Sequence, residues 1–133
     1  MNDITIYVCR GCRGPQPTDG PPPDDATPRP GAMLYQAAET AACDTPTACT
    51  ISVVPVDCLA NCNRGPSAAM QGQDRWTYVF GGLDPATGGP ALIAGAQLLA
   101  ESADGLLPWR GRPDALKRGL IARVPPAVPR SPG

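Results

Sequence analysis

Prolines limit where this chain can form regular structure, and they gather in two segments. Seven of the 18 prolines, with three glycines, fall within Gly14–Gly31, and four more fall within Val124–Gly133. Proline fixes φ and lacks a backbone N–H, so neither segment can form a continuous helix or a central strand. We therefore expect a Pro/Gly-rich loop at residues 14–31 and a disordered Pro-rich tail at residues 124–133. The remaining chain is predicted to be one domain, residues 1–123.

Strand and helix patterns alternate through this domain. Apolar residues alternate with polar ones near the N-terminus, and β-branched residues later dominate a second short segment, so both are predicted to be strands. The predicted elements are strands at 4–8, 50–56, 68–71 and 76–80, and helices at 32–43, 91–102 and near 114–122. The order β-α-β followed by β-β-α is typical of an α/β protein with a thioredoxin-like fold, in which both units share one sheet.

Six cysteines and no histidine restrict the chemistry of the chain. Without histidine, the chain cannot supply a Cys-His nucleophile pair, a mixed Cys/His zinc site or a Rieske centre. Cys9 and Cys12 form a C-x2-C pair after the first predicted strand, and Cys58 and Cys62 form a C-x3-C pair after the second. Parallel strands of a β-α-β unit end at the same sheet edge, so the two pairs should converge there. Four thiolates suit one zinc ion or a [2Fe–2S] cluster, and spacing alone does not decide between them.

Other roles for the cysteines remain open at this point. Cys9 and Cys12 resemble a thiol–disulfide pair in spacing, but such a pair normally opens a helix that lowers the thiol pKa. The prolines that follow Cys12 oppose a helix there, and the pairs can also be free thiols. Cys43 and Cys49 flank the predicted end of the first helix. They are interpreted as incidental thiols packed near that end, with a C-x5-C disulfide or a substitute ligand as alternatives.

One cysteine motif resembles a known family. The segment CLANCNRGP, Cys58–Pro66, followed by a strand and then Trp76-Thr77-Tyr78, resembles the second cluster motif of the thioredoxin-like [2Fe–2S] ferredoxins. Residues 4–115, from Tyr7-Val8-Cys9 to Arg112-Pro113, are also similar to bacterial predicted metal-binding proteins of unknown function, often encoded near cobalamin-biosynthesis genes.

The resemblance implies a thioredoxin-like fold, a [2Fe–2S] cluster as cofactor, and one-electron transfer by a homodimer. It assigns Cys9, Cys58 and Cys62 as cluster ligands. The ferredoxins place their second cysteine farther along the chain, whereas the nearby cysteine here is Cys12, which we assign as the fourth ligand. The protein is then a small electron carrier rather than an enzyme, with a reductase or oxidoreductase as its partner and cobalamin biosynthesis as the suggested pathway. The alternatives are a four-cysteine zinc-binding structural or interaction module, and a thiol–disulfide oxidoreductase using Cys9 and Cys12.

Charge and hydropathy point away from nucleic acid and membranes. The net charge of −1 gives no basic footprint for nucleic acid or an anionic membrane, and no apolar stretch can span a bilayer. The N-terminus lacks the pattern of a signal peptide, so we expect a cytoplasmic protein. Residues 105–133 nevertheless carry six bases against Asp114 alone, either as a solvated tail or as a docking surface for a protein. Trp76 and Tyr78 are expected to be core or dimer-interface residues rather than an electron path, and Trp109 is expected to be a packing residue.

Overall fold

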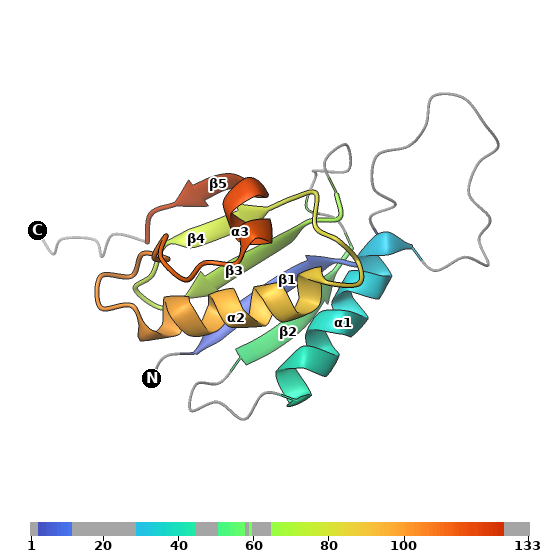
Figure 1. The fold of residues 1–133 in the computed structure, drawn as a ribbon, viewed down its shortest axis with the longest axis horizontal. Coiled ribbons are helices and arrows are strands. Elements are labelled where there is room, and N and C mark those ends of the chain that lie inside the picture. The colour runs from blue at the N-terminus through green and yellow to red at the C-terminus, as the bar shows by residue number, and fades with distance from the viewer. Residues whose placement is uncertain (1–2, 12–28, 45–50, 58, 60–64, 127–133) are drawn as a thin grey trace, which may run out of the picture.

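A computed structural model describes residues 3–11, 29–44, 51–57, 59 and 65–126 (Figure 1). It contains strands β1 (Ile4–Cys9), β2 (Ile51–Val56), β3 (Ala68–Gly72), β4 (Thr77–Phe80) and β5 (Leu120–Val124), and helices α1 (Pro30–Asp44), α2 (Gly88–Glu101) and α3 (Asp114–Arg118). The five strands form one sheet in the order β2-β1-β3-β4-β5. The predicted loop at 14–31 and tail at 124–133 lie mostly outside the described residues.

The sheet has the predicted thioredoxin-like topology. β1 and β2 are parallel, with Ile4 opposite Ile51 and Cys9 opposite Val56. β3 is antiparallel to β1, β4 to β3, and β5 to β4. A β-α-β unit and a β-β-α unit therefore share one sheet, and the two strands that precede the cysteine pairs end at the same edge.

Alternate residues of the central strands form the core. Ile4, Ile6 and Val8 of β1 have no exposed surface, and their neighbours on β3 and β4 are also buried, including Met70 and Tyr78. Helices α1 and α2 lie side by side over the sheet (Figure 1) and contribute further apolar side chains: Leu34, Ala38, Leu92, Ala96 and Leu99. This period-2 burial, matched by a helical face, explains why the strand and helix patterns were readable in the sequence.

Both long helices begin earlier than the sequence pattern indicated. α1 starts at Pro30 rather than Ala32, and α2 starts at Gly88 rather than Ala91. Proline is tolerated in a first helical turn, where its missing N–H would have no partner within the helix. Gly89 allows α2 to approach α1, because a Cβ there would lie 2.5 Å from the carbonyl carbon of Ala37. Packing between the helices therefore extends α2 through residues that the sequence suggested would break it.

The C-terminal elements differ from the prediction. A helix was expected near 114–122, but α3 ends at Arg118 and residues 120–124 form the edge strand β5. Val124, assigned to the tail, is the last residue of that strand. Pairing of β5 with β4, where Arg123 lies opposite Tyr78, decides this segment, because an edge strand gains its hydrogen bonds from a partner distant in sequence.

The aromatic predictions have mixed outcomes. Tyr78 is 1% exposed, and Trp76 packs partly buried against the core, as expected. Trp109 is 63% exposed, so its expected role as a packing residue is wrong. Among the described helices, none is long and apolar enough to cross a membrane.

Candidate metal centre

The first cysteine lies where β1 ends between two neighbouring segments. The Cys9 N–H donates to the Ser67 carbonyl at 3.0 Å, and the Arg10 N–H donates to the Val56 carbonyl at 2.9 Å. The end of β1 is therefore attached to the end of β2 on one side and to the start of the β3 segment on the other. We call the described residues at this end of the sheet, 9–11, 57, 59 and 65–67, the cysteine edge.

The Cys9 side chain is enclosed at this edge. Only 2% of the residue is exposed, and its Sγ lies 3.7 Å from the backbone carbonyl oxygen of Asp57, in position to donate a weak S–H hydrogen bond. Asp57 is the residue before Cys58 in the chain. The thiol that ends β1 is thus in contact with the segment that leads from β2 into the second cysteine pair.

A second contact joins the same two segments. A Cβ atom built on Gly11 would lie 2.6 Å from the Asp57 carbonyl oxygen, closer than real Cβ contacts occur. Glycine at position 11 therefore lets the backbone after β1 lie directly against the backbone after β2. Gly11 precedes Cys12, and Asp57 precedes Cys58. One predicted ligand from each cysteine pair therefore follows directly after a residue of this contact.

Two arginines place positive charge at the cysteine edge. Arg10 donates to the Asp57 carboxylate from Nε at 3.2 Å and from Nη2 at 3.1 Å. Both side chains are well exposed, so the ion pair contributes about 1 kcal/mol or less. Arg29 donates from Nη1 to the Gly11 carbonyl at 3.1 Å. On α1, the hydrogen bond to Glu39 raises the pKa of Tyr35, while the charge of Arg10 acts in the opposite direction.

Two helices begin near the cysteine edge. Both α1 and α2 begin at the end of the sheet where β1 and β2 finish (Figure 1). The loop that leads into α2 is attached to the cysteine edge, because the Leu83 N–H donates to the Pro66 carbonyl at 3.2 Å. The N–H groups of a helix start carry partial positive charge, which favours a nearby anionic group. At α2 the Asp84 carboxylate already accepts from the Ala86 and Thr87 N–H groups, at 2.7 and 3.1 Å, so the start of α1 is the one that can serve another anion.

The described residues contain only part of the predicted ligand set. Cys9 is described, whereas Cys12, Cys58 and Cys62 lie outside the described residues, as does Cys49. Within the described ranges, no group of three or more cysteine, histidine, aspartate or glutamate side chains is positioned to hold a metal ion. The structure therefore brings together the residues that precede Cys12 and Cys58, and it leaves the four-cysteine assignment as a prediction.

Cys43 lies far from this edge. It is exposed near the C-terminal end of α1. The first residue of that helix, Pro30, follows Arg29, whose side chain donates to Gly11 of the cysteine edge. At 1.5 Å per residue, the 13 residues from Pro30 to Cys43 span about 20 Å along the helix. Cys43 is therefore not packed into the core, and it is too distant to act as a substitute ligand beside Cys9.

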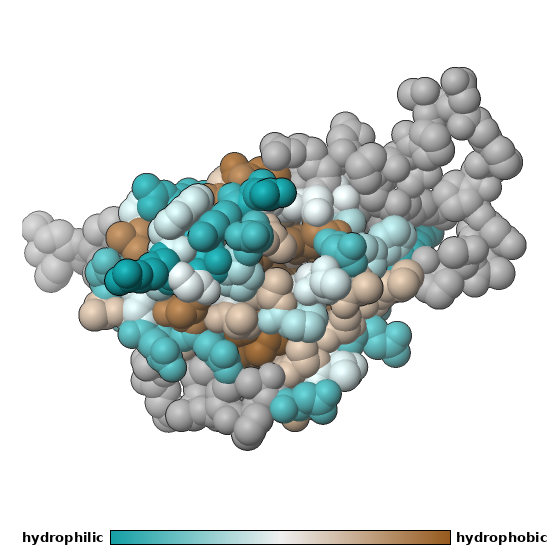
Figure 2. Space-filling model, viewed as in Figure 1, coloured by the Kyte–Doolittle hydropathy of each residue, from teal (hydrophilic) through white to brown (hydrophobic). Residues whose placement is uncertain are grey.

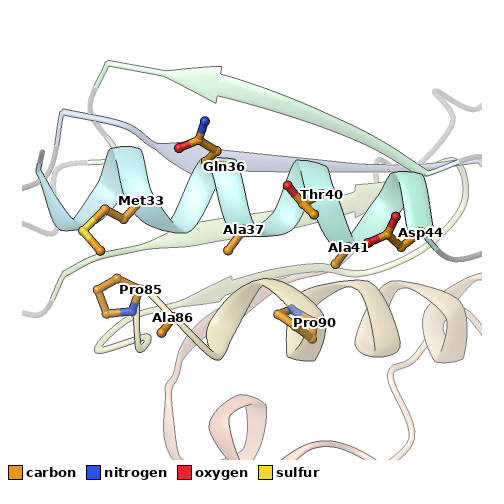
Figure 3. Close-up of a pocket in the computed structure, with 9 residues that line it drawn as sticks. All are labelled: Met33, Gln36, Ala37, Thr40, Ala41, Asp44, Pro85, Ala86 and Pro90. Carbon is orange, nitrogen blue, oxygen red and sulfur yellow. The ribbon is translucent and has the colours of Figure 1, made fainter.

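A hollow of about 440 Å³ lies between α1 and the start of α2 (Figure 3). Met33 of α1 points toward Pro85 across it, and most other lining side chains are small, with Asp44 as the one titratable group among them. A single exposed carboxylate at the end of a helix supplies neither a nucleophile with its base nor an acid–base pair. We assign no catalytic role to this hollow.

Comparison with protein families classifies the chain. A family model described as "Protein of unknown function (DUF1636)" matches residues 6–126. The chain belongs to this family. No curated protein matches the sequence of this DUF1636 member. Among solved structures, it is similar to a thioredoxin-like [2Fe–2S] ferredoxin from Aquifex aeolicus, with 18% sequence identity and a TM-score of 0.48 over 94% of this chain and 96% of that chain.

Sequence reasoning missed two contributors to the site of this DUF1636 protein. The first is Gly11, whose position inside the C-x2-C pair hinted at a tight backbone approach but did not name Asp57 as the partner. The second is Arg29, which lies in the Pro-rich segment and reaches back to the Gly11 carbonyl. Neither contact follows from local sequence, because each joins segments at least 18 residues apart.

Proposed function

We propose that this protein is a small one-electron carrier whose [2Fe–2S] cluster is held by Cys9, Cys12, Cys58 and Cys62. The observation that carries the proposal is the backbone contact between Gly11 and Asp57, the residues that immediately precede Cys12 and Cys58. The resemblance of the Cys58–Pro66 motif to the thioredoxin-like ferredoxins supports the choice of cluster over other metal centres.

The chemistry of the described residues fits a [2Fe–2S] cluster. The Cys9 thiol is buried and lies against the second ligand segment, so loss of its proton would leave a thiolate in a place shielded from water. A cluster held by four thiolates is anionic, and Arg29 and the start of α1 supply compensating positive potential, whereas Arg10 is already paired with Asp57. Backbone N–H groups near the ligands would lower the cost of adding an electron. When bound, a [2Fe–2S] cluster supplies reversible one-electron transfer.

Location favours a carrier over an enzyme. The cysteine edge lies at one end of the sheet, where the loops emerge, and the hollow between α1 and α2 has no group suited to acid–base or nucleophilic work. Electron transfer needs access for a partner protein but no substrate pocket. We propose a reductase or oxidoreductase as that partner; a homodimeric state and a role in cobalamin biosynthesis stay predictions from the sequence resemblance.

Zinc is the second candidate for the same site, because four thiolates in two pairs also match a structural zinc site. In that case the protein is a structural or interaction module without redox activity. The third candidate, a dithiol oxidoreductase, has less support. Arg10 and Gly11, between Cys9 and Cys12, lie in a turn, and the described helix that follows begins only at Pro30.

Elemental analysis of anaerobically purified protein separates the three candidates. About two irons and two sulfides per chain, with a brown colour, support the carrier. Colourless protein with one zinc per chain contradicts the carrier and supports the module. Metal-free protein in which Cys9 and Cys12 reversibly form a disulfide contradicts both metal proposals.

A further inference from the structure

An exposed tryptophan near α3 makes cation–π contacts with two side chains. Trp109 is 63% exposed, the Cζ of Arg112 lies 5.2 Å from its ring centroid, and the Nζ of Lys117 lies 5.0 Å from it. A tryptophan at a protein surface normally gains by burying its ring. Here the ring is kept in water and fixed by cation–π contacts, each contributing about 0.5–1 kcal/mol at exposed sites.

The support beneath Trp109 is rigid. Arg112 is 9% exposed and donates to the carbonyl oxygens of Leu107 at 2.6 Å and Pro108 at 3.1 Å. Its guanidinium also lies 5.9 Å from the ring centroid of the buried Tyr78. Burial lowers the pKa of Arg112, yet arginine stays protonated at any physiological pH. A core side chain thus orders the segment that presents Trp109, which reduces the entropy that a binding partner must overcome.

The segments around this tryptophan are rich in bases. We call Trp109 and the bases of the α3 region and β5, Arg110, Lys117, Arg118 and Arg123, the basic face; Lys117 lies over the Trp109 ring and Arg123 over the Trp76 ring. Figure 2 shows hydrophilic residues over α3 and its surroundings. Described residues 105–126 carry five bases and only Asp114 as an acid. The other described residues carry eight acids, Asp3, Glu39, Asp44, Asp57, Asp74, Asp84, Glu101 and Asp104, and three bases, Arg10, Arg29 and Arg75. The described part of the protein therefore has a strong charge asymmetry.

Backbone hydrogen bonds connect the basic face to the cysteine edge. Gly119, which follows Arg118, accepts at its carbonyl from the Gly81 N–H at 2.8 Å. The loop that continues from Gly81 is attached to the cysteine edge through Leu83 and Pro66, as described above. A partner bound at the basic face would therefore contact a part of the protein that is linked by backbone hydrogen bonds to the segment beside Cys9.

We propose that the basic face is a docking surface for an acidic protein surface that places an apolar side chain against Trp109. Tryptophan and arginine are the residues most enriched among those that dominate protein interfaces, and opposite charge accelerates association. That this partner is the electron donor or acceptor rests on the proposed function; the docking itself does not. Nucleic acid is disfavoured, because single strands are bound by several stacking aromatic side chains and Trp109 is the one strongly exposed aromatic among the described residues.

The test uses an acidic peptide as the probe. A peptide of about 16 residues, Glu-rich with a central leucine and a fluorescent label, is smaller than one partner's side of a typical interface. The full chain is titrated into it while the fluorescence anisotropy of the label is followed, so that the Trp109→Ala variant is measured by the same signal. We expect saturable binding that weakens as salt rises from about 50 to 200 mM. Arg110→Gln, Lys117→Gln and Arg118→Gln combined should weaken binding about tenfold or more, and Trp109→Ala alone should weaken it several-fold.

A matched triple variant controls for net charge. Gln36→Glu, Gln71→Glu and Gln73→Glu change the net charge by the same −3 at exposed positions outside the basic face. This control should bind the peptide within about twofold of the unmodified chain, because screening limits the reach of distant surface charges. An equal loss of binding in the control would overturn the proposal, since net charge rather than this face would then explain it.

Two further outcomes also contradict the proposal. One is absence of peptide binding at low salt; the other is tighter binding of a single-stranded oligonucleotide of equal charge, which would make the face a nucleic-acid site. Iron and sulfide are measured in every variant. Peptide binding by a chain that lacks iron would contradict the electron-carrier proposal and support the docking surface. The failure of one proposal is therefore distinguishable from the failure of the other.

Discussion

The cysteine edge and the basic face are held in place in different ways. Around α3, ordering comes from a buried side-chain network, in which the Tyr78 hydroxyl accepts from the Leu107 N–H at 2.8 Å and Arg112 donates to two carbonyls. At the cysteine edge, the contacts between segments include backbone hydrogen bonds, the buried Cys9 thiol on the Asp57 carbonyl, one arginine on a carbonyl, and an exposed ion pair. The exposed ion pair contributes little, so the segments after β1 and β2 are joined there mainly through their backbones rather than through a buried arginine.

This difference shows what a metal centre would contribute. A metal that binds only the folded state adds its binding free energy to the free energy of unfolding. This addition matters most where the protein supplies few other interactions. At the cysteine edge, the segments after β1 and β2 meet through their backbones and an exposed ion pair, so we expect a metal centre to add its stabilisation there. The basic face needs no cofactor to be ordered, which suits a surface that must be ready to bind a partner.

The largest effect is expected from the second cysteine pair. Cys58→Ser or Cys62→Ser should reduce iron from about two per chain to near zero, because a cluster iron that loses a thiolate is poorly retained. Cys43→Ser and Cys49→Ser are the controls and should keep full iron content. Iron loss in the Cys43 or Cys49 variant would show that the ligand assignment is wrong.

The next effect concerns Arg112, whose guanidinium supports Trp109 of the basic face. Arg112→Met removes both hydrogen bonds to the 107–108 carbonyls and should lower the free energy of unfolding by about 2–3 kcal/mol. Arg110→Met, at an exposed position, should change it by less than about 0.5 kcal/mol. Urea denaturation measures both values. Iron per folded chain should be unchanged in each, and a loss of iron in Arg112→Met would show that the two regions are not independent.

Separating the two cysteine-bearing segments should instead lower the iron content. Gly11→Ala places a Cβ against the Asp57 carbonyl, so the segments must move apart, at a cost of about 1–3 kcal/mol, and iron content should fall. Gly89→Ala makes a comparable backbone clash between α2 and α1 and is the matched control. It should lower stability while the folded fraction retains its iron. Equal iron loss in both variants would mean that general destabilisation, not local separation, releases the cluster.

The smallest effect is a pH dependence near the end of α2. Asp104 accepts from the Ser102 hydroxyl at 2.7 Å and the Leu106 N–H at 3.0 Å, and these hydrogen bonds lower the pKa of its carboxyl group. A lowered folded-state pKa contributes stability above the unfolded pKa, near 4, and this contribution is lost as the pH falls through the folded value.

Asp104→Asn tests that sign. The variant should be slightly less stable than the unmodified chain at pH 7, and the difference should shrink as the pH falls from about 5 to below the lowered pKa. Thermal unfolding at a series of pH values measures it. A difference that stays constant or grows toward low pH would contradict the assigned role of the carboxylate.

Local pattern was sufficient for most of the fold. Alternation in Ile4–Val8 predicted β1, apolar spacing predicted both long helices, and the resulting element order predicted the thioredoxin-like sheet. These features were readable because burial on one side of a strand or helix leaves a periodic record in the sequence. The same reasoning predicted that the two cysteine pairs meet at one edge; Gly11 and Asp57 are in contact there, and the meeting of the pairs themselves stays a prediction.

Where sequence reasoning failed, distant partners decided the outcome. Residues 120–124 became a strand because β4 offered an open edge, and α2 began at Gly88 because α1 lay close enough to require glycine. Trp109 is exposed and its ring contacts Arg112 and Lys117, and the contact with Lys117 joins residues eight apart in the chain. The sequence alone determined the elements, their order and the available ligand chemistry. Tertiary structure decided strand edges, helix starts and surface aromatics, because those depend on neighbours that no local pattern encodes.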